Sequence, residues 1–186
     1  MTREDILEAA AQVFRQKGYH GASMEDIARA VNLQKPSLYH HVSSKQDILL
    51  ALLNRALELL LERISPISNQ NIPADQKLQE MVRAYLQILA ENMDLSAVLL
   101  FEHRSLERKQ HARHVPHRDR FEALWRDVLE EGVTSKLFTC DDPALATRAI
   151  LGVLNWTVTW YHPEGVLEID EIADRYSTLL LNGLCR

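Results

Sequence analysis

The chain has 186 residues, of which 46% are hydrophobic and 25% charged, a composition typical of a globular protein with a buried core. Its net charge of -5 excludes a uniformly basic protein, but residues 1–46 hold six Lys or Arg against five Asp or Glu. The acidic excess therefore belongs to the remainder, which leaves the N-terminal part free to approach phosphates. The charged first residues predict no secretory leader, and no apolar run reaches the roughly 20 residues that cross a bilayer. Two widely spaced cysteines without a motif indicate reduced thiols in a cytoplasmic protein.

The first predicted helix covers residues 3–17. Its apolar side chains recur at helical spacing and form one stripe. Lys17 supplies a cation to the last turn, and Gly18 supplies a left-handed stop just beyond it. We expect this helix to be scaffold for the segment that follows.

Residues 23–47 predict two short helices joined by a tight turn, followed by the start of another helix. Ser23 with Asp26 forms a capping box, so a helix over 24–31 should begin there. Asn32 stands where a left-handed residue would let the chain reverse.

The second short helix opens with Lys35 and with Pro36, whose missing amide is harmless in a first turn. Leu38 and Val42 face inward at a spacing of four, which leaves a polar free face. Such a face suits reading of the DNA major groove better than it suits a protein core. The residues that we expect to contact DNA are Ser23, Gln34, Lys35, Ser37, Tyr39, His40 and Lys45.

Four pieces of this region together resemble the N-terminal domain of the TetR family of bacterial transcriptional regulators. They are Phe14 with Gly18-Tyr19, Ser23-Met24-x-x-Ile27-Ala28, Leu38-Tyr39 with His40, and Lys45-x-Asp47-Ile48-Leu49. The resemblance implies a helix-turn-helix domain over residues 1–46 that binds a palindromic double-stranded DNA operator. Asn32 and Val42 depart from the Gly and the aromatic residue that are usual in the family. Gln34 is a weaker helix cap than Ser or Thr, so the sequence preference of a relative should not be transferred.

The remaining residues, 47–186, are expected to form a helical ligand-binding and dimerisation domain. The chain as a whole then has an all-α fold of about nine helices. Later helices are predicted over 45–64, 74–92, 95–107, 117–131, from 142 onward, and over 169–184. Residues 65–73 are expected to be a linker, Pro116 a helix break and Gly132 a helix stop.

The last two predicted helices indicate a homodimer. Residues 149–163 contain no Asp, Glu, Lys or Arg, so the helix there must be covered on nearly every side. The final helix, 169–184, is amphipathic. We expect both to pair with their copies in a four-helix bundle, as the family resemblance also implies.

A local reversal of charge appears in residues 102–121, with six Lys or Arg against three acids and four His. Arg suits phosphate groups through its planar fork, so an anionic ligand is one interpretation. A solvated helix surface is the other, and the sequence leaves both open.

Two further motifs are similar to the C-terminal domain of TetR regulators that respond to acyl-CoA thioesters and control fatty-acid, sterol or aromatic-acid degradation. They are Phe101 through Arg118-Asp119-x-Phe121-Glu122, and Asn155-Trp156-x3-Trp160-Tyr161-x-Pro163-x-Gly165. The resemblance implies an acyl tunnel with CoA phosphates bound by basic residues. Candidates for the tunnel are Tyr85, Leu89, Phe101, Trp125, Asn155, Trp156 and Thr159, and candidates for the phosphates are Arg104, Arg118 and Arg120. Each aromatic residue has plain core packing as its other interpretation.

Three rival functions have less support in the sequence. A metal site on His111, His114 and His117 lacks a Cys or paired carboxylate, and Pro116 interrupts the alignment of the three histidines. A helical enzyme would need a motif such as a Gly-rich phosphate loop, GxSxG or HExxH, which the chain lacks. A sensor of apolar cations would need buried carboxylates. We therefore expect a repressor, not an enzyme, without metal or cofactor, whose DNA affinity falls when an acyl-CoA or another small apolar molecule binds.

Overall fold

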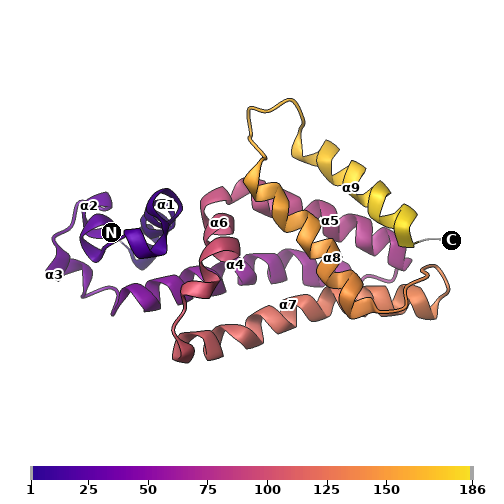
Figure 1. Cartoon of the computed structure of the whole chain (residues 1–186), viewed down its shortest axis with the longest axis horizontal. Helices are drawn as coiled ribbons and strands as arrows, with labels where there is room; N and C mark the ends of the chain where they lie inside the picture. The colour runs from indigo at the N-terminus through magenta and orange to yellow at the C-terminus, as the bar shows by residue number, and fades with distance from the viewer. Residues whose placement is uncertain (1, 185–186) are drawn as a thin grey trace. The chain divides into compact units, whose positions relative to one another are not determined.

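The computed structural model describes residues 2–184, and within them the fold is all α, as predicted (Figure 1). The nine α-helices and two short 3-10 helices of this part are α1 (Arg3–Gly21), α2 (Met24–Ala30), α3 (Lys35–Leu38), α4 (Lys45–Ser68), α5 (Ala74–Glu91), α6 (Met93–Glu102), η1 (His103–Ser105), α7 (Arg108–Thr134), α8 (Pro143–Trp156), η2 (Thr157–Thr159) and α9 (Ile169–Leu184).

The described residues form two compact units. The N-terminal unit contains residues 2–58 and 92–117, and the C-terminal unit contains residues 59–91 and 118–184. The division falls inside α4 and α7, so each of these long helices contributes to both units. The predicted functional division after residue 46 stays a prediction.

No single helix within residues 2–184 is both long and apolar enough to span a bilayer. In this range, only α5 together with the α6–η1 segment, a pair bent by 103°, reaches that length and hydrophobicity.

The core of the N-terminal unit is built around α1. Ile6 and Ala10 are fully buried and Phe14 nearly so, because their spacing puts them on one helical face. This face packs with α2, while α1 also contacts α6. Arg15 of α1 binds Asp94 of α6 at 2.6 Å, which adds an ion pair at the edge of that contact.

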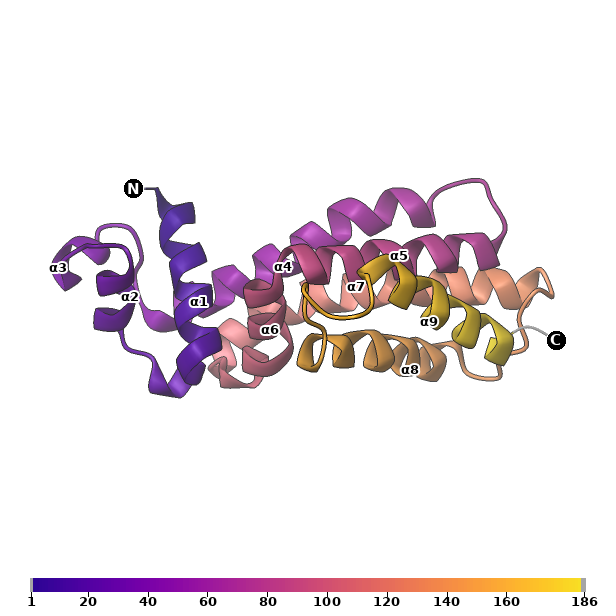
Figure 2. The same cartoon turned by 90° about the horizontal axis from the view of Figure 1, so that it is seen from above.

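In the C-terminal unit, α5 is the helix that α8, α9 and η2 all contact. Both views show α9 running beside α5 (Figures 1 and 2). Ten of the 18 residues of α5 are buried, including Lys77, whose ammonium binds Glu131 of α7 at 2.7 Å. A charge this deeply buried is tolerated because it is paired.

Local signals predicted the starts of several helices correctly. Ser23 and Asp26 form the expected capping box of α2, and Asp142 caps α8 with Pro143 in its first turn. Gly18 and Asn32 both adopt the left-handed conformation, with φ of 69° and 54°. A short helical turn continues after Gly18, so α1 extends to Gly21.

The predicted linker at 65–73 was wrong in its first part. α4 continues through Pro66 to Ser68, although proline removes one hydrogen bond of the helix. The side chains of Ser68 and Asn69 both donate to the Ser65 carbonyl oxygen, at 2.9 and 2.8 Å. Residues that were interpreted as turn formers therefore close the last turn of a helix.

The predicted break at Pro116 and the stop at Gly132 were also wrong, because α7 runs from Arg108 to Thr134. His114 and Phe121, on either side of Pro116 in the sequence, are both buried. Gly132 is helical, and a Cβ at this position would overlap the ring of Phe138. The predicted helix 95–107 instead begins at 93 and ends at 102, where η1 follows.

Gly132→Ala should lower the free energy of unfolding by about 1–3 kcal/mol, because overpacking forces a buried ring to move. A Cβ at this position would lie 2.0 Å from Cδ2 of Phe138. Urea denaturation followed by circular dichroism measures the change. Gly21→Ala is the matched control, since its Cβ would meet only the Lys17 side chain at 3.8 Å. Equal stability of the two variants would contradict the assigned contact.

Candidate nucleic-acid interface and ligand site

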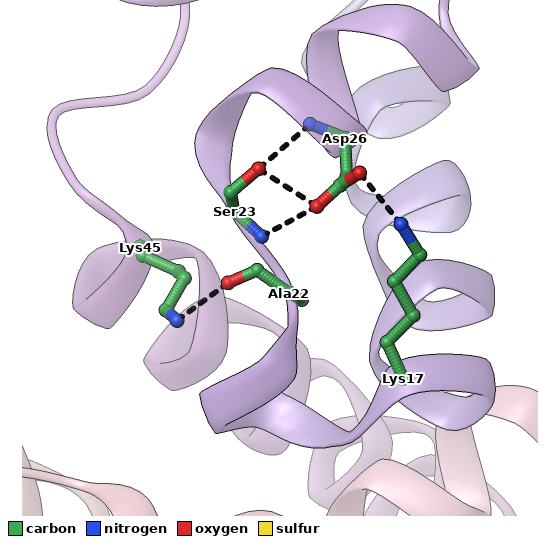
Figure 3. Close-up of polar contacts among 5 residues, drawn as sticks. All are labelled: Lys17, Ala22, Ser23, Asp26 and Lys45. Carbon is green, nitrogen blue, oxygen red and sulfur yellow. Dashed lines mark hydrogen bonds and ion pairs between the residues drawn. The ribbon is translucent and has the colours of Figure 1, made fainter.

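The capping box at Ser23 fixes the start of α2 (Figure 3). The Ser23 hydroxyl accepts from the amide of Asp26 at 3.1 Å and donates to its carboxylate at 2.7 Å, and the Ser23 amide donates back at 2.9 Å. Lys17 of α1 also binds the Asp26 carboxylate, at 2.6 Å. Hydrogen bonds from Lys17 and then from Ser23 lower the pKa of Asp26 well below its ordinary value. Ser23, which was predicted to contact DNA, is exposed, and its hydroxyl is hydrogen-bonded to Asp26.

Lys45, the first residue of α4, holds the end of α1 (Figure 3). Its ammonium donates to the carbonyl oxygens of Tyr19 and Ala22, both at 2.7 Å, and lies 4.2 Å from the centroid of the Tyr19 ring. A cation at a helix C-terminus is stabilised by the carbonyl groups that lack intrahelical partners. Two of the three N–H groups of Lys45 are therefore used within the protein.

The other predicted DNA contacts lie on or beside α3. Leu38 is fully buried and anchors this helix of four residues, while Tyr39 keeps 47% of its surface exposed. Gln34, Lys35 and His40 are exposed, and Ser37 is half-buried. Gln34 makes no capping hydrogen bond, in agreement with its weak capping tendency.

Sequence analysis missed Arg29 as a member of this surface. Arg29 of α2 is exposed and lines a hollow of about 480 Å³ together with Gln34 and Lys35. Its position on the polar face of α2 was visible in the sequence, but only the α2–α3 packing brings it beside Lys35.

Gln46 was also missed, and it joins distant segments of the N-terminal unit. Its amide nitrogen donates to the Tyr19 hydroxyl and to the Ser105 carbonyl oxygen, both at 2.8 Å. Its amide oxygen accepts from the backbone of Glu107 at 3.0 Å. Burial raises the pKa of Tyr19, which keeps its hydroxyl neutral as a partner for Gln46. Gln46 and Ser105 are separated by 59 positions in the sequence, and no sequence pattern predicts their contact.

An aromatic cluster lies in the C-terminal unit. It contains two of the predicted ligand residues, Tyr85 and Trp125, and is hydrogen-bonded to a third, Asn155. Tyr85 of α5 packs against Phe121 and Trp125 of α7, with centroids 6.1 and 6.0 Å away, and Phe121 and Trp125 are 6.3 Å apart. The Tyr85 hydroxyl donates to the side-chain oxygen of Asn155 in α8. Burial raises the pKa of Tyr85, so the hydroxyl stays protonated. Leu89, another candidate, is 2% exposed on the same helix as Tyr85.

The remaining ligand candidates are exposed, unlike the buried residues of this cluster. Trp156 is 66% exposed, and the exposed Thr159 donates to the Trp156 carbonyl oxygen at 2.7 Å. Arg118 is bound by Asp119 at 2.8 Å and lies 3.7 Å from Glu122, whereas Arg120 is exposed. Phe101 and Arg104 are exposed residues of the N-terminal unit.

The histidines of α7 have separate surroundings. His111 is exposed, while His114 is buried with Nδ1 at 3.1 Å from the side-chain oxygen of Asn54. No group of three or more His, Cys, Asp or Glu within residues 2–184 is arranged to hold a metal ion.

The exposed apolar residues of α8 and α9 form a third surface. Leu145, Trp156 and Leu179 are 61, 66 and 64% exposed, respectively. A Cβ added at Gly152 or Gly183 would meet nothing within 4 Å. These helices therefore present open apolar faces in the single chain.

Comparisons with known proteins agree with this architecture. The family described as "Bacterial regulatory proteins, tetR family" matches residues 6–52, and "Tetracyclin repressor-like, C-terminal domain" matches residues 71–184. The chain belongs to the TetR family of transcriptional regulators.

Particular relatives include the repressor KstR2 of Rhodococcus jostii, 28% identical over 98% of this chain and 90% of the relative. The fatty acid metabolism regulator protein of Bacillus subtilis is 25% identical over 96% of this chain and 93% of its own. Among solved structures, PfmR of Thermus thermophilus has a TM-score of 0.88 and 35% identity, covering 97 and 99% of the two chains. AibR in complex with isovaleryl coenzyme A and operator DNA has a TM-score of 0.89 and 25% identity, covering 96 and 97%. The protein is thus a TetR-type repressor of the group with lipid-related and acyl-CoA-linked members, and its relatives are regulators, not enzymes.

Lys45→Met should lower the free energy of unfolding by about 1.5–3 kcal/mol, the range for hydrogen bonds to charged groups. The two α1 carbonyl oxygens would lose their cation, and the Tyr19 ring would lose the ammonium above it. Urea denaturation measures the loss. Lys35→Met, at an exposed position, is the control and should stay within about 0.5 kcal/mol of the wild type. Equal stability of Lys45→Met and wild type would refute the assigned role.

Proposed function

We propose that the protein is a homodimer that binds a palindromic operator through α3 and responds to an acyl-CoA thioester. The observation that carries the DNA contact is the exposed α3 face, on which Lys35 and Tyr39 flank the fully buried Leu38. Leu38 ties the helix to the core, so the flanking side chains are held in a fixed direction. The phosphates of DNA favour cations at this surface, and Lys35 and Arg29 supply them.

The homodimer is supported by the faces of α8 and α9. Leu145, Ala149, Gly152 and Trp156 follow one another at spacings of four, three and four, so they share one side of α8. All four are exposed in the single chain, and Leu179 adds a similar position on α9. A two-fold pairing of these faces would cover them. It would also present two copies of α3 to half-sites about 34–36 Å apart.

The acyl-CoA effector is supported by chemistry in the C-terminal unit. The rings of Tyr85, Phe121 and Trp125 offer an apolar environment for an acyl chain. Arg120 is next to Phe121 in α7, is exposed and makes no ion pair within residues 2–184, so it can meet a phosphate. The solved complex of AibR with isovaleryl coenzyme A supports the same ligand class.

The response to ligand is a shift between two arrangements of the reading helices. A ligand moves that equilibrium only as far as its affinities for the two arrangements differ. Within the N-terminal unit, Gln46 ties the segment at Ser105 and Glu107 to the first turn of α4. Movement of the α6–η1 segment would therefore reach α4 and, through Tyr19, the end of α1.

Replacement of Lys35 should weaken operator binding without changing stability. The operator is first selected from random duplexes by the wild-type protein, and affinity is then measured by fluorescence anisotropy over a range of salt concentrations. Lys35→Met should reduce the salt slope by about one per protomer if its ammonium contacts a phosphate. Arg55→Met, which replaces another exposed cation of the N-terminal unit, should leave the slope unchanged. An unchanged slope for Lys35→Met would remove α3 as the phosphate contact.

Leu179→Glu should convert the dimer into monomers at micromolar concentration, because the charge would be buried without a partner in the pairing face. Sedimentation velocity reads the mass directly. Val166→Glu is the matched control, since Val166 is 99% exposed in the loop before α9 and should leave the dimer intact. A wild-type protein that sediments as a monomer would contradict the proposed assembly.

A further inference from the structure

Four side chains of the C-terminal unit have a buried polar atom without a hydrogen-bond partner within residues 2–184, namely those of Asp75, Trp125, Thr157 and Ser177. The indole Nε1–H of Trp125 and the hydroxyl of Thr157 both lie in fully buried side chains, and neither finds a partner within residues 2–184. Burying such groups unpaired costs free energy, and native proteins rarely do so without a functional reason. Trp125 lies on α7, and Thr157 lies on η2, which contacts α5. Trp125 and Thr157 thus place unpaired polar groups on two separate elements of this unit, and Asp75 and Ser177 add one each on α5 and α9.

The other polar groups of the aromatic cluster are already used. The Tyr85 hydroxyl donates to the side-chain oxygen of Asn155, whereas the Trp125 nitrogen has no acceptor within residues 2–184. Tyr85 and Phe121 pack edge-on against Trp125, at interplanar angles of 80° and 69°, and fix the indole in place. The polar group of Trp125 is therefore preorganised within an apolar setting.

The chemistry of the indole restricts what can fill this position. Its nitrogen can only donate, so the partner must be a hydrogen-bond acceptor. An ionised carboxylate would need a cation, and the buried Lys77 of this unit is already paired with Glu131. The cluster itself contributes aromatic rings, a neutral phenol and an amide. A neutral carbonyl oxygen on an otherwise apolar group meets these conditions.

We propose that Trp125 is a specificity-determining residue whose Nε1–H donates a hydrogen bond to the carbonyl oxygen of the bound acyl group. This inference rests on the proposed acyl-CoA response and names the atom of the ligand that the protein reads. The acyl chain packs against the aromatic rings of the cluster, while the carbonyl oxygen fills the acceptor position at the indole. The Thr157 hydroxyl is a second polar group available to the same ligand. The site therefore distinguishes a thioester from an apolar chain of equal length.

The test compares thioesters with thioethers that lack only the carbonyl oxygen. Isothermal titration of the full-length protein uses butanoyl-, octanoyl- and hexadecanoyl-CoA, each beside the S-alkyl coenzyme A of the same carbon number. The wild type should bind the best thioester about tenfold more tightly than its thioether, and Trp125→Phe should lose about that factor for the thioester alone. Thr157→Val offers a smaller change, and a selective loss of thioester affinity there would support a polar contact from η2.

A spectroscopic measurement keeps the proposal testable even if Trp125→Phe fails to fold. The carbonyl stretch of a carbon-13 labelled thioester should move to lower frequency on binding to the wild type, because a hydrogen bond weakens the C=O bond. An unshifted stretch would overturn the proposal, as would a Trp125→Phe variant that weakens thioester and thioether equally. If the wild type binds no CoA thioester of any length, the proposed effector is itself wrong, and the titration alone reveals this.

Discussion

The ammonium of Lys45 at the end of α1 is the interaction on which the N-terminal unit depends. It binds two carbonyl oxygens that the helix leaves unpaired, so the first residue of α4 and the last turn of α1 cannot separate cheaply. Gln46, the next residue, joins the same place to Ser105 and Glu107. The consequence is that α4 begins at a point where three segments meet.

The C-terminal unit shows a different use of burial. Its aromatic cluster has the packing of an ordinary core, with ring centroids about 6 Å apart, yet the indole nitrogen of Trp125 is left unpaired. An ordinary core avoids such groups because their desolvation is not repaid. This unpaired donor, next to Tyr85 with its hydroxyl bonded to Asn155, is what distinguishes the proposed binding site from plain packing. Burial alone would not have made that distinction, since Leu89 is equally buried and carries no polar group.

Helix starts could be predicted from the sequence because their causes are local. Ser23 and Asp26 lie three residues apart and satisfy each other, and Asn32 needs only its own backbone freedom. Helix ends failed where the cause was distant. Gly132 remains helical beneath the Phe138 ring, and α7 passes through Pro116 between buried neighbours. The contacts of Lys45 with carbonyl oxygens 23 and 26 residues earlier have no sequence signature, and its DNA contact stays a prediction.

The sequence by itself determined the all-helical class and the α2–α3 motif with its exposed polar face, because these follow from periodicity, capping and turn chemistry within short windows. The family followed from the resemblance of its motifs to those of known regulators. Tertiary structure alone decided which polar side chains are free. It engaged the Ser23 hydroxyl and the Lys45 ammonium in internal hydrogen bonds, placed Arg29 and Lys35 around one hollow, made Gln46 a junction, and left the Trp125 nitrogen without an acceptor. The physical reason is that hydrogen-bond satisfaction depends on neighbours in space, which the order of residues along the chain does not reveal.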